Sequence, residues 1–126
     1  MDLNKVNALS NKIIGLAIEV HRNLGPGLLE ATYQQCLAYE LSTNGINFVL
    51  EHPIPLKYKD INIDCSFRAD VIVADCIILE LKAIDKILPI HEAQLMTYLK
   101  ITGIKLGLII NFNVKTLKEG IKRIIL

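Results

Sequence analysis

The segment Lys105–Asn111, which reads KLGLIIN, restricts the possible folds of this chain more than any other part of the sequence. Five consecutive residues of it are apolar or glycine, and such a short apolar run predicts a strand that is buried on both faces. A sheet that is buried on both faces needs helices on both sides. The segment therefore predicts a domain of the α/β or α+β class, in which helices flank a mixed β-sheet.

Three helices are expected around this sheet. Residues 4–24 carry apolar side chains at steps of three and four, which form one apolar stripe, and a Gly-Pro-Gly turn then ends the helix. Residues 28–43 form a second helix that ends at an Asn-Gly pair, because both residues tolerate a left-handed backbone. Residues 89–102 form a third, with proline at its start and glycine after its end.

The remaining segments are expected to be extended. Residues 46–59 contain Pro53 and Pro55, which exclude a central position in the sheet. Further strands are predicted at residues 61–65, Phe67–Val73 and Ile77–Ala83. The tail, residues 114–126, predicts a helical turn and a short final strand. The expected order is α-α-β-β-β-α-β with a short ending, in a single domain of residues 1–126.

The composition excludes several classes of protein. Of the 126 residues, 52% are hydrophobic and 21% are charged, so the chain can bury a core and is unlike a disordered chain. A formal net charge of +1 excludes a polybasic binder. No apolar run approaches the roughly 20 residues that span a bilayer, and the N-terminus lacks a secretory signal. The three cysteines form no C-x-x-C pair, so we expect reduced thiols in a cytoplasmic protein.

Charge is distributed unevenly along the chain. Residues 100–126 hold six basic side chains against one acid, a net charge of +5, whereas residues 1–99 hold eight against twelve, a net charge of −4. The basic C-terminal segment could contact phosphates. A solvated, lysine-rich surface is the simpler interpretation.

The residues that suggest chemistry lie in two adjacent predicted strands. Glu80 lies within the apolar segment Cys76–Ala83, and a buried carboxylate is costly unless it has a partner. Because alternate residues of a strand share a face, Glu80 and Lys82 point the same way. If Asp70 lies opposite Glu80, residues 74–76 form a three-residue hairpin loop. A two-residue loop would put Asp70 on the other face.

Opposed Asp70 and Glu80 side chains would need a counter-charge, because two carboxylates about 5 Å apart repel each other. Oxygen ligands of this kind suit Mg²⁺ or Mn²⁺, with waters and a substrate phosphate at the other positions. Lys82 could then hold the attacking water or offset negative charge on phosphorus. The alternative is an ordinary half-exposed hairpin with alternating charges, since D-x9-E-x-K occurs by chance in many strands.

Two helices carry further candidate residues. Gln94 and Tyr98 are four residues apart and share a helical face directly after the E-x-K strand. Glu30 and Tyr33 share a face of the second helix. A solvent-facing stripe is the alternative for Gln94 and Tyr98, and a favourable interaction with the helix dipole is the alternative for Glu30.

The sequence resembles a known family. Residues 27–33, GLLEATY, are similar to the signature of the bacterial and archaeal GxxExxY proteins, and residues 19–27 before them resemble that family too. Further matches are Arg68–Asp70, Glu80–Ala83 and the pair Gln94 and Tyr98. The resemblance covers nearly the whole chain, and this family is grouped with the PD-(D/E)XK nuclease superfamily.

The resemblance implies a restriction-endonuclease-like core and a role for each strand residue. Asp70 and Glu80 would be the metal-binding acids, the Leu81 carbonyl a third ligand, and Lys82 the catalytic lysine. The proline that precedes the first acid in the superfamily is Ala69 here. That proline is a preference of shape and not a ligand, so the chemistry is not excluded.

The resemblance also implies roles for the helical residues. Gln94 and Tyr98 would match the Q-x-x-x-Y motif of the RecB-type exonucleases, which is thought to help position substrate or metal. Glu30 would be the helix-borne acid that often completes such sites, as a further metal ligand.

The sequence therefore leaves two functions open. The first is a nuclease that depends on Mg²⁺ or Mn²⁺ and hydrolyses phosphodiester bonds, with DNA favoured over RNA as substrate and the basic C-terminal segment on the backbone. The alternative is a non-catalytic nucleic-acid-binding or protein-interaction module that keeps the nuclease fold, which the small size and near-neutral charge favour. The complete set of Asp70, Glu80 and Lys82 favours the enzyme. A chain this small offers little surface to enclose a duplex, so a homodimer or a larger protein partner is also expected.

Overall fold

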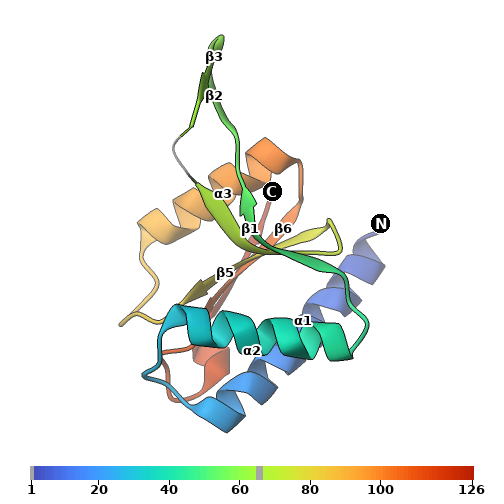
Figure 1. Cartoon of the computed structure of the whole chain (residues 1–126), viewed down its shortest axis with the longest axis vertical. Helices are drawn as coiled ribbons and strands as arrows, with labels where there is room; N and C mark the ends of the chain where they lie inside the picture. Colours follow the sequence, from blue (N-terminus) through green and yellow to red (C-terminus); the bar gives the residue numbers. More distant parts are fainter. Residues whose placement is uncertain (1, 65–66) are drawn as a thin grey trace.

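The computed structural model describes residues 2–64 and 67–126, and in this part of the chain five strands form one mixed sheet with helices against both faces (Figure 1). The sheet order is β1-β4-β5-β6-β7, with β5 and β6 parallel and the other pairs antiparallel. The helices are α1 (Leu3–Leu24), α2 (Glu30–Thr43) and α3 (Pro89–Thr102). The strands are β1 (Phe48–Pro53), β4 (Arg68–Val73), β5 (Ile77–Lys82), β6 (Leu106–Asn111) and β7 (Ile121–Ile125). The predicted α+β architecture is confirmed.

The apolar strand β6 lies inside the sheet, as its sequence predicted. All six of its residues are buried. Leu108 and Ile110 pack into the core beneath α1 and α2, whereas Ile109 packs into a second core beneath α3. β5 is divided in the same way, because Leu79 and Leu81 belong to the first core. Glu80 therefore points towards the side of the sheet that α3 covers.

Both predicted N-terminal helices form, although the second begins two residues later than expected. The Tyr33 hydroxyl donates to the Gly25 carbonyl at 2.6 Å and accepts the Leu28 N–H at 3.2 Å, so it holds the segment before α2 outside the helix. The Tyr33 ring stacks on Phe112 with ring centroids 4.3 Å apart. None of the helices in the described residues is long and apolar enough to cross a membrane.

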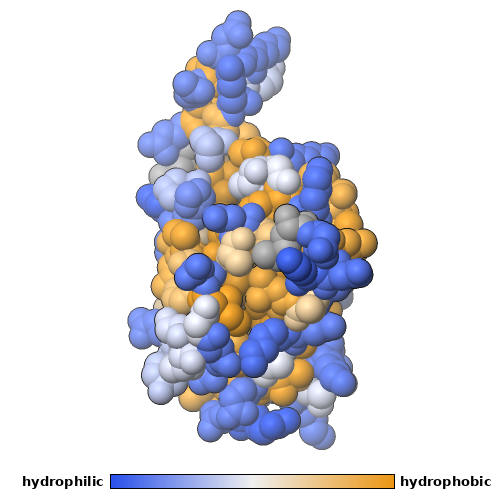
Figure 2. All heavy atoms as spheres, turned by 90° about the vertical axis from the view of Figure 1, so that its right-hand side faces the viewer, coloured by the Kyte–Doolittle hydropathy of each residue, from blue (hydrophilic) through white to orange (hydrophobic). Residues whose placement is uncertain are grey.

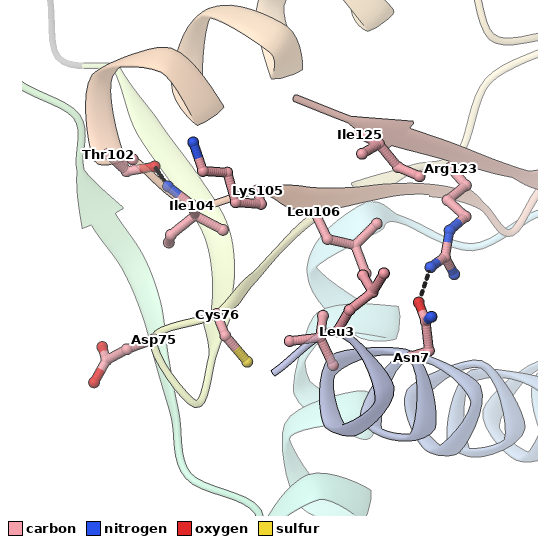
Figure 3. Close-up of a pocket in the computed structure, with 12 residues that line it drawn as sticks. Leu3, Asn7, Asp75, Cys76, Thr102, Ile104, Lys105, Leu106, Arg123 and Ile125 are labelled. Carbon is pink, nitrogen blue, oxygen red and sulfur yellow. Dashed lines mark hydrogen bonds between the residues drawn. The ribbon is translucent and has the colours of Figure 1, made fainter. Parts of the chain in front are cut away.

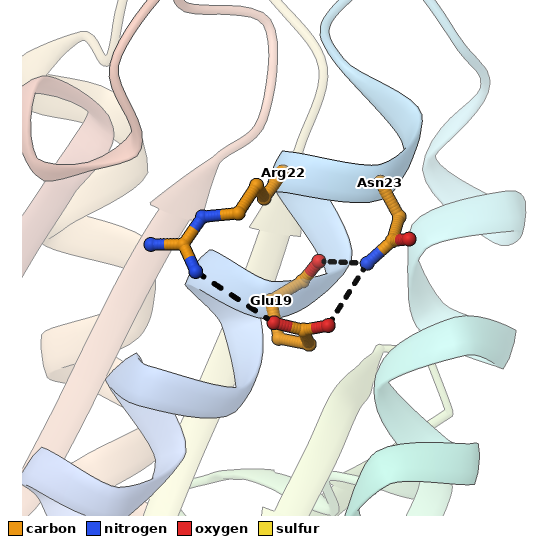
Figure 4. A network of polar contacts seen from close by, with 3 residues as sticks. All are labelled: Glu19, Arg22 and Asn23. Carbon is orange, nitrogen blue, oxygen red and sulfur yellow. Dashed lines mark hydrogen bonds and ion pairs between the residues drawn. The ribbon is translucent and has the colours of Figure 1, made fainter.

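The last turn of α1 is closed by a small polar network on its surface (Figure 4). The Asn23 side-chain amide donates to the Glu19 carbonyl at 2.8 Å and to the Glu19 carboxylate at 3.1 Å. Arg22 pairs with the same carboxylate at 3.9 Å, and both side chains are more than half exposed. Such an exposed pair contributes at most about 1 kcal/mol, so this network shapes the helix end rather than a functional site.

The proline-containing strand β1 forms one edge of the sheet, as predicted. After it the chain leaves the sheet as a separate two-stranded hairpin, β2 (Leu56–Tyr58) and β3 (Ile61–Ile63). This hairpin stands clear of the rest of the molecule (Figures 1 and 2). The strand predicted at residues 61–65 therefore ends at Ile63, and residue 65 lies outside the described part. The predicted tail is confirmed as a 3-10 turn, η1 (Leu117–Gly120), followed by β7.

The hairpin between β4 and β5 has the register that brings the two acids together. Val71 pairs with Leu79 and Val73 with Ile77, which leaves residues 74–76 as a three-residue loop. Ala74 and Asp75 hold the loop in left-handed conformations, with φ of 50° and 56°. Continued by one residue, this register sets Asp70 opposite Glu80, which is the alternative that the metal-site hypothesis required.

Candidate functional site

The candidate site lies where β4 and β5 separate. Their pairing reaches Val71 and Leu79 and then stops, although β4 continues along β1 and β5 continues along β6. In the fork, the Asp70 N–H donates to Glu80 Oε2 at 2.9 Å, and the Leu81 N–H donates to Asp70 Oδ2 at 2.8 Å. Each carboxylate is thus tied to the main chain of the opposite strand, which fixes both side chains in the opening.

Burial dominates the electrostatics of these two acids. Glu80 is 4% exposed, and its burial together with the negative charge of Asp70 raises its pKa to about 8. The pKa of Asp70 is also raised, first by burial and then by the charge of Glu51. Lys82 directly follows Leu81, whose N–H binds Asp70, and it lies two residues after Glu80 in β5, so it is next to the pair. Its ammonium lowers the pKa of both acids. The hairpin therefore brings Asp70, Glu80 and Lys82 to one place.

Helix α2 adds Glu30 to the site. Glu30 is the first residue of α2, which agrees with the helix-dipole interpretation of the sequence. Its carboxylate also accepts the Ala83 N–H at 3.1 Å, directly after Lys82, and its charge raises the pKa of Asp70. For Glu30, the favourable interaction with the helix dipole and a role in the site are therefore compatible.

Two residues of the site were missed by the sequence analysis. Glu51 lies in β1 between residues that pair with Val71 and Ala69, so it falls opposite Asp70, and it has a left-handed backbone with φ of 51°. The Gln34 side-chain amide donates to Glu51 Oε2 at 3.0 Å and to the Asp70 carbonyl at 2.9 Å. Gln34 follows Glu30 by one helical turn, so the helical period could have identified it. Nothing in the sequence gives the register of β1 that identifies Glu51.

The carboxylates of Glu30, Glu51 and Asp70 form a row along the site, and a pocket of about 210 Å³ opens beside this carboxylate row. Its lining residues come from α2 and from three neighbouring strands: Glu30, Ala31, Gln34, Glu51, Asp70 and Leu81. Three of the six carry carboxylates, so the pocket is suited to a cationic ligand.

Of the two α3 candidates, only Tyr98 senses the charges of the two acids. Tyr98 is 4% exposed, and burial together with the charges of Glu80 and Asp70 raises its pKa to about 12. Its hydroxyl therefore stays protonated and can donate a hydrogen bond near the acids. Gln94 makes no hydrogen bond to any described site residue and instead lines a shallow hollow of about 280 Å³ on the outside of α3.

A larger hollow, of about 390 Å³, lies at the other end of the same strands (Figure 3). Asp75 and Cys76 of the hairpin loop line it, together with Arg123, whose guanidinium donates to Asn7. Most of its exposed lining is apolar, and it has no opposed acids. The smaller pocket at the carboxylate row is therefore the chemically better candidate.

The basic C-terminal segment does not form one face. Lys105 lies at the end of the sheet where the hairpin loop is, since the next residue, Leu106, pairs with Ile77 directly after that loop. Lys115 and Lys118 follow β6 at the opposite end, where the Phe112 N–H donates to the Lys82 carbonyl at 2.9 Å. Only part of the segment is therefore on the side of the candidate site.

The donor set fits a hard divalent cation in its chemistry. Carboxylate oxygens are the ligands that Mg²⁺ and Mn²⁺ prefer. One oxygen of Asp70 and one of Glu80 accept main-chain N–H groups, and the second oxygen of each could bind a cation. Among the described residues, however, no three His, Cys, Asp or Glu side chains are already arranged to hold a metal ion. The raised pKa of Glu80 favours a protonated carboxyl at neutral pH, and a proton there removes the repulsion between Glu80 and Asp70.

The raised pKa of Glu80 predicts how stability depends on pH. Its ordinary value is 4.5, so between pH 4.5 and about 8 the folded metal-free chain binds this proton more tightly than the unfolded chain does. Stability should therefore fall as pH rises through that window. Each pKa unit corresponds to about 1.4 kcal/mol, so the loss is a few kcal/mol.

Thermal unfolding in EDTA across pH 5–8.5 measures this effect. Glu80→Gln should unfold at a nearly constant temperature across the window and should be more stable than the wild type at pH 8. Parallel pH profiles for the two proteins would show that Glu80 does not take up the proton.

Comparison with known proteins identifies a family for most of the chain. A family model described as PD-(D/E)XK nuclease superfamily matches residues 7–124. No curated protein and no solved structure matches the chain. The matched range includes all the site residues described above.

Proposed function

Because the chain belongs to the PD-(D/E)XK nuclease superfamily, we propose that it is a divalent-metal-dependent nuclease that acts at the fork between β4 and β5. The observation that carries this proposal is the convergence of Asp70, Glu80 and Lys82 where those strands separate. The substrate we propose is DNA, and the subfamily we propose is that of the GxxExxY proteins, whose signature residues 27–33 resemble.

Each residue of the fork has a distinct task in this proposal. Asp70 and Glu80 would hold Mg²⁺ or Mn²⁺, together with the Leu81 carbonyl and, from α2, Glu30. A bound ion would supply Lewis-acid activation of the phosphodiester and of the attacking water. The Lys82 ammonium would orient the attacking water or offset the charge that develops on phosphorus. Tyr98 stays protonated and can donate a hydrogen bond to a phosphate oxygen.

Nuclease assays with defined metals test the proposal. Labelled single- and double-stranded DNA and RNA of the same sequence are incubated with the protein in EDTA, Mg²⁺ or Mn²⁺. Cleavage of DNA is expected only with a divalent cation. It should fall at least about a hundred-fold in Asp70→Asn and in Glu80→Gln, because each loses a charged ligand.

Asp85→Asn is the matched control, because Asp85 is an exposed acid only three residues beyond Lys82. It should retain the wild-type rate. Cleavage that survives in both site variants would mean that the activity is not at the fork. Metal-dependent binding of nucleic acid without cleavage by the wild type would favour the non-catalytic module instead.

A further inference from the structure

The β2–β3 hairpin, which we call the arm (residues 54–64), has one apolar face and one polar face. In its register Leu56 pairs with Ile63 and Tyr58 with Ile61, so these four side chains share a face. The other pair, Lys57 with Asn62, lies on the opposite face. Figure 2 shows the arm standing clear of the body, with hydrophilic residues over much of the visible side.

The apolar face of the arm is largely uncovered. Tyr58 is 57% exposed, Ile61 is 60% exposed and Ile63 is 36% exposed. An isolated hairpin of this size is only marginally stable in water. Exposed apolar side chains gathered on a projecting element mark a surface that binds a partner.

The position of the arm connects it to the candidate site. It leaves the sheet from β1, which carries Glu51, and returns to β4, which carries Asp70. At its base the Ile54 N–H donates to the Phe67 carbonyl at 2.9 Å, and a hollow of about 330 Å³ opens there. The Phe67 ring lies 6.3 Å from the ring of Tyr98, whose pKa is raised by burial and by the charges of Glu80 and Asp70. Aromatic side chains therefore lie between the base of the arm and the fork.

We propose that the arm is the nucleic-acid-binding element of the site, with Tyr58 stacked on an unpaired base. This inference rests on the proposed function. Lys59 lies 5.4 Å from the centre of the Tyr58 ring, whereas Lys57 is exposed on the opposite face. The arm also carries Asp60 and Asp64, so its net charge is zero and the stacking surface of Tyr58, rather than charge, is what the arm offers to nucleic acid. The fork itself is strongly acidic, and contacts to phosphate backbone must come from outside it.

The exposed apolar area of the arm favours nucleic acid over a second copy of this chain as the bound partner. The exposed parts of Tyr58, Ile61 and Ile63 amount to roughly 300 Å² for side chains of this size. A stable dimer buries about 800 Å² of total surface on each partner, so the apolar face of the arm is too small to hold one by itself. One stacked base needs far less area, and stacking on an aromatic side chain strengthens binding roughly ten-fold or more.

The test uses the absence of tryptophan from this chain. Tyr58→Trp introduces a single indole on the arm, and Tyr39→Trp introduces one at a site of similar exposure, 66%, on the outside of α2. In EDTA, where a metal-dependent nuclease does not cut, a single-stranded oligonucleotide should quench the Tyr58→Trp fluorescence and leave the Tyr39→Trp fluorescence unchanged. Duplex DNA of the same sequence should quench it much less.

Binding affinities complete the test. By fluorescence anisotropy, Tyr58→Ala should weaken binding of the single strand about ten-fold, whereas Tyr58→Phe should bind as the wild type does. The proposal for the arm is overturned if the wild type binds or cleaves nucleic acid while both Tyr58→Ala and the indole are unaffected. It is also overturned if the wild type is a dimer that Tyr58→Ala dissociates. A wild type that neither binds nor cleaves any nucleic acid would overturn the proposed function, and the arm proposal with it.

Discussion

Replacing Lys82 with methionine is expected to lower the single-turnover rate of DNA cleavage about a hundred- to ten-thousand-fold. The side chain follows Glu80 by two residues on the same face of β5, and its charge lowers the pKa of both Asp70 and Glu80. Methionine keeps most of the length of lysine and removes only the charge. DNA binding, measured by anisotropy in Ca²⁺, should change less than about three-fold, because the other contacts to DNA remain.

Loss of the Lys82 charge should also make the two acids harder to ionise. The pH above which cleavage begins should therefore rise in Lys82→Met, and a pH–rate profile in Mg²⁺ would show the shift. Lys86→Met is the control, since Lys86 is exposed in the loop after β5 and should be replaceable without effect. A Lys82→Met protein that cleaves within three-fold of the wild type would exclude the lysine from the chemistry.

The hairpin shows how far the sequence alone could predict the site. Strand period reduced the question to two registers, because a three-residue loop puts Asp70 and Glu80 on one face and a two-residue loop does not, and the structure has the three-residue loop that the metal-site hypothesis required. The burial of Glu80 followed from its apolar neighbours. These are local properties, and each depends on residues that are close together in the chain.

Glu51 and the arm could not be predicted in this way. Glu51 joins the row of acids only through the pairing of β1 with β4, which joins segments about twenty residues apart, and its own neighbours predict an ordinary exposed edge strand. The arm was predicted only as extended chain, because its alternation of apolar and polar residues is that of any half-buried strand. Its exposure depends on what the rest of the chain leaves uncovered.

Gly120→Ala is expected to destabilise the fold strongly, although it adds only one methyl group. A Cβ at Gly120 would lie 2.1 Å from the main-chain oxygen of Asn111. Asn111 is 1% exposed, and its side chain accepts the Ile84 N–H at 3.1 Å and donates to the Ile84 carbonyl at 2.9 Å. The added methyl group must therefore move the main chain of Asn111 at the end of β6. The Asn111 side chain also holds the segment after Lys82 in place. We expect a loss of about 3 kcal/mol or more and a fall in Tm of about 10 °C.

Alanine variants of two other glycines serve as references for the Tm of Gly120→Ala. At Gly107 a Cβ would meet the Leu95 side chain at 2.8 Å, and because a side chain can rotate away, Gly107→Ala should cost less than Gly120→Ala. Gly15 lies exposed within α1 with nothing within 4 Å of an added Cβ, so Gly15→Ala should stabilise the helix by about 0.5–1 kcal/mol. In one set of thermal scans, Gly15→Ala should therefore melt above the wild type. Gly107→Ala should melt below the wild type, and Gly120→Ala should have the lowest Tm. A Gly120→Ala protein that melts within 2 °C of the wild type would show that β6 and the turn before β7 do not approach as closely as described.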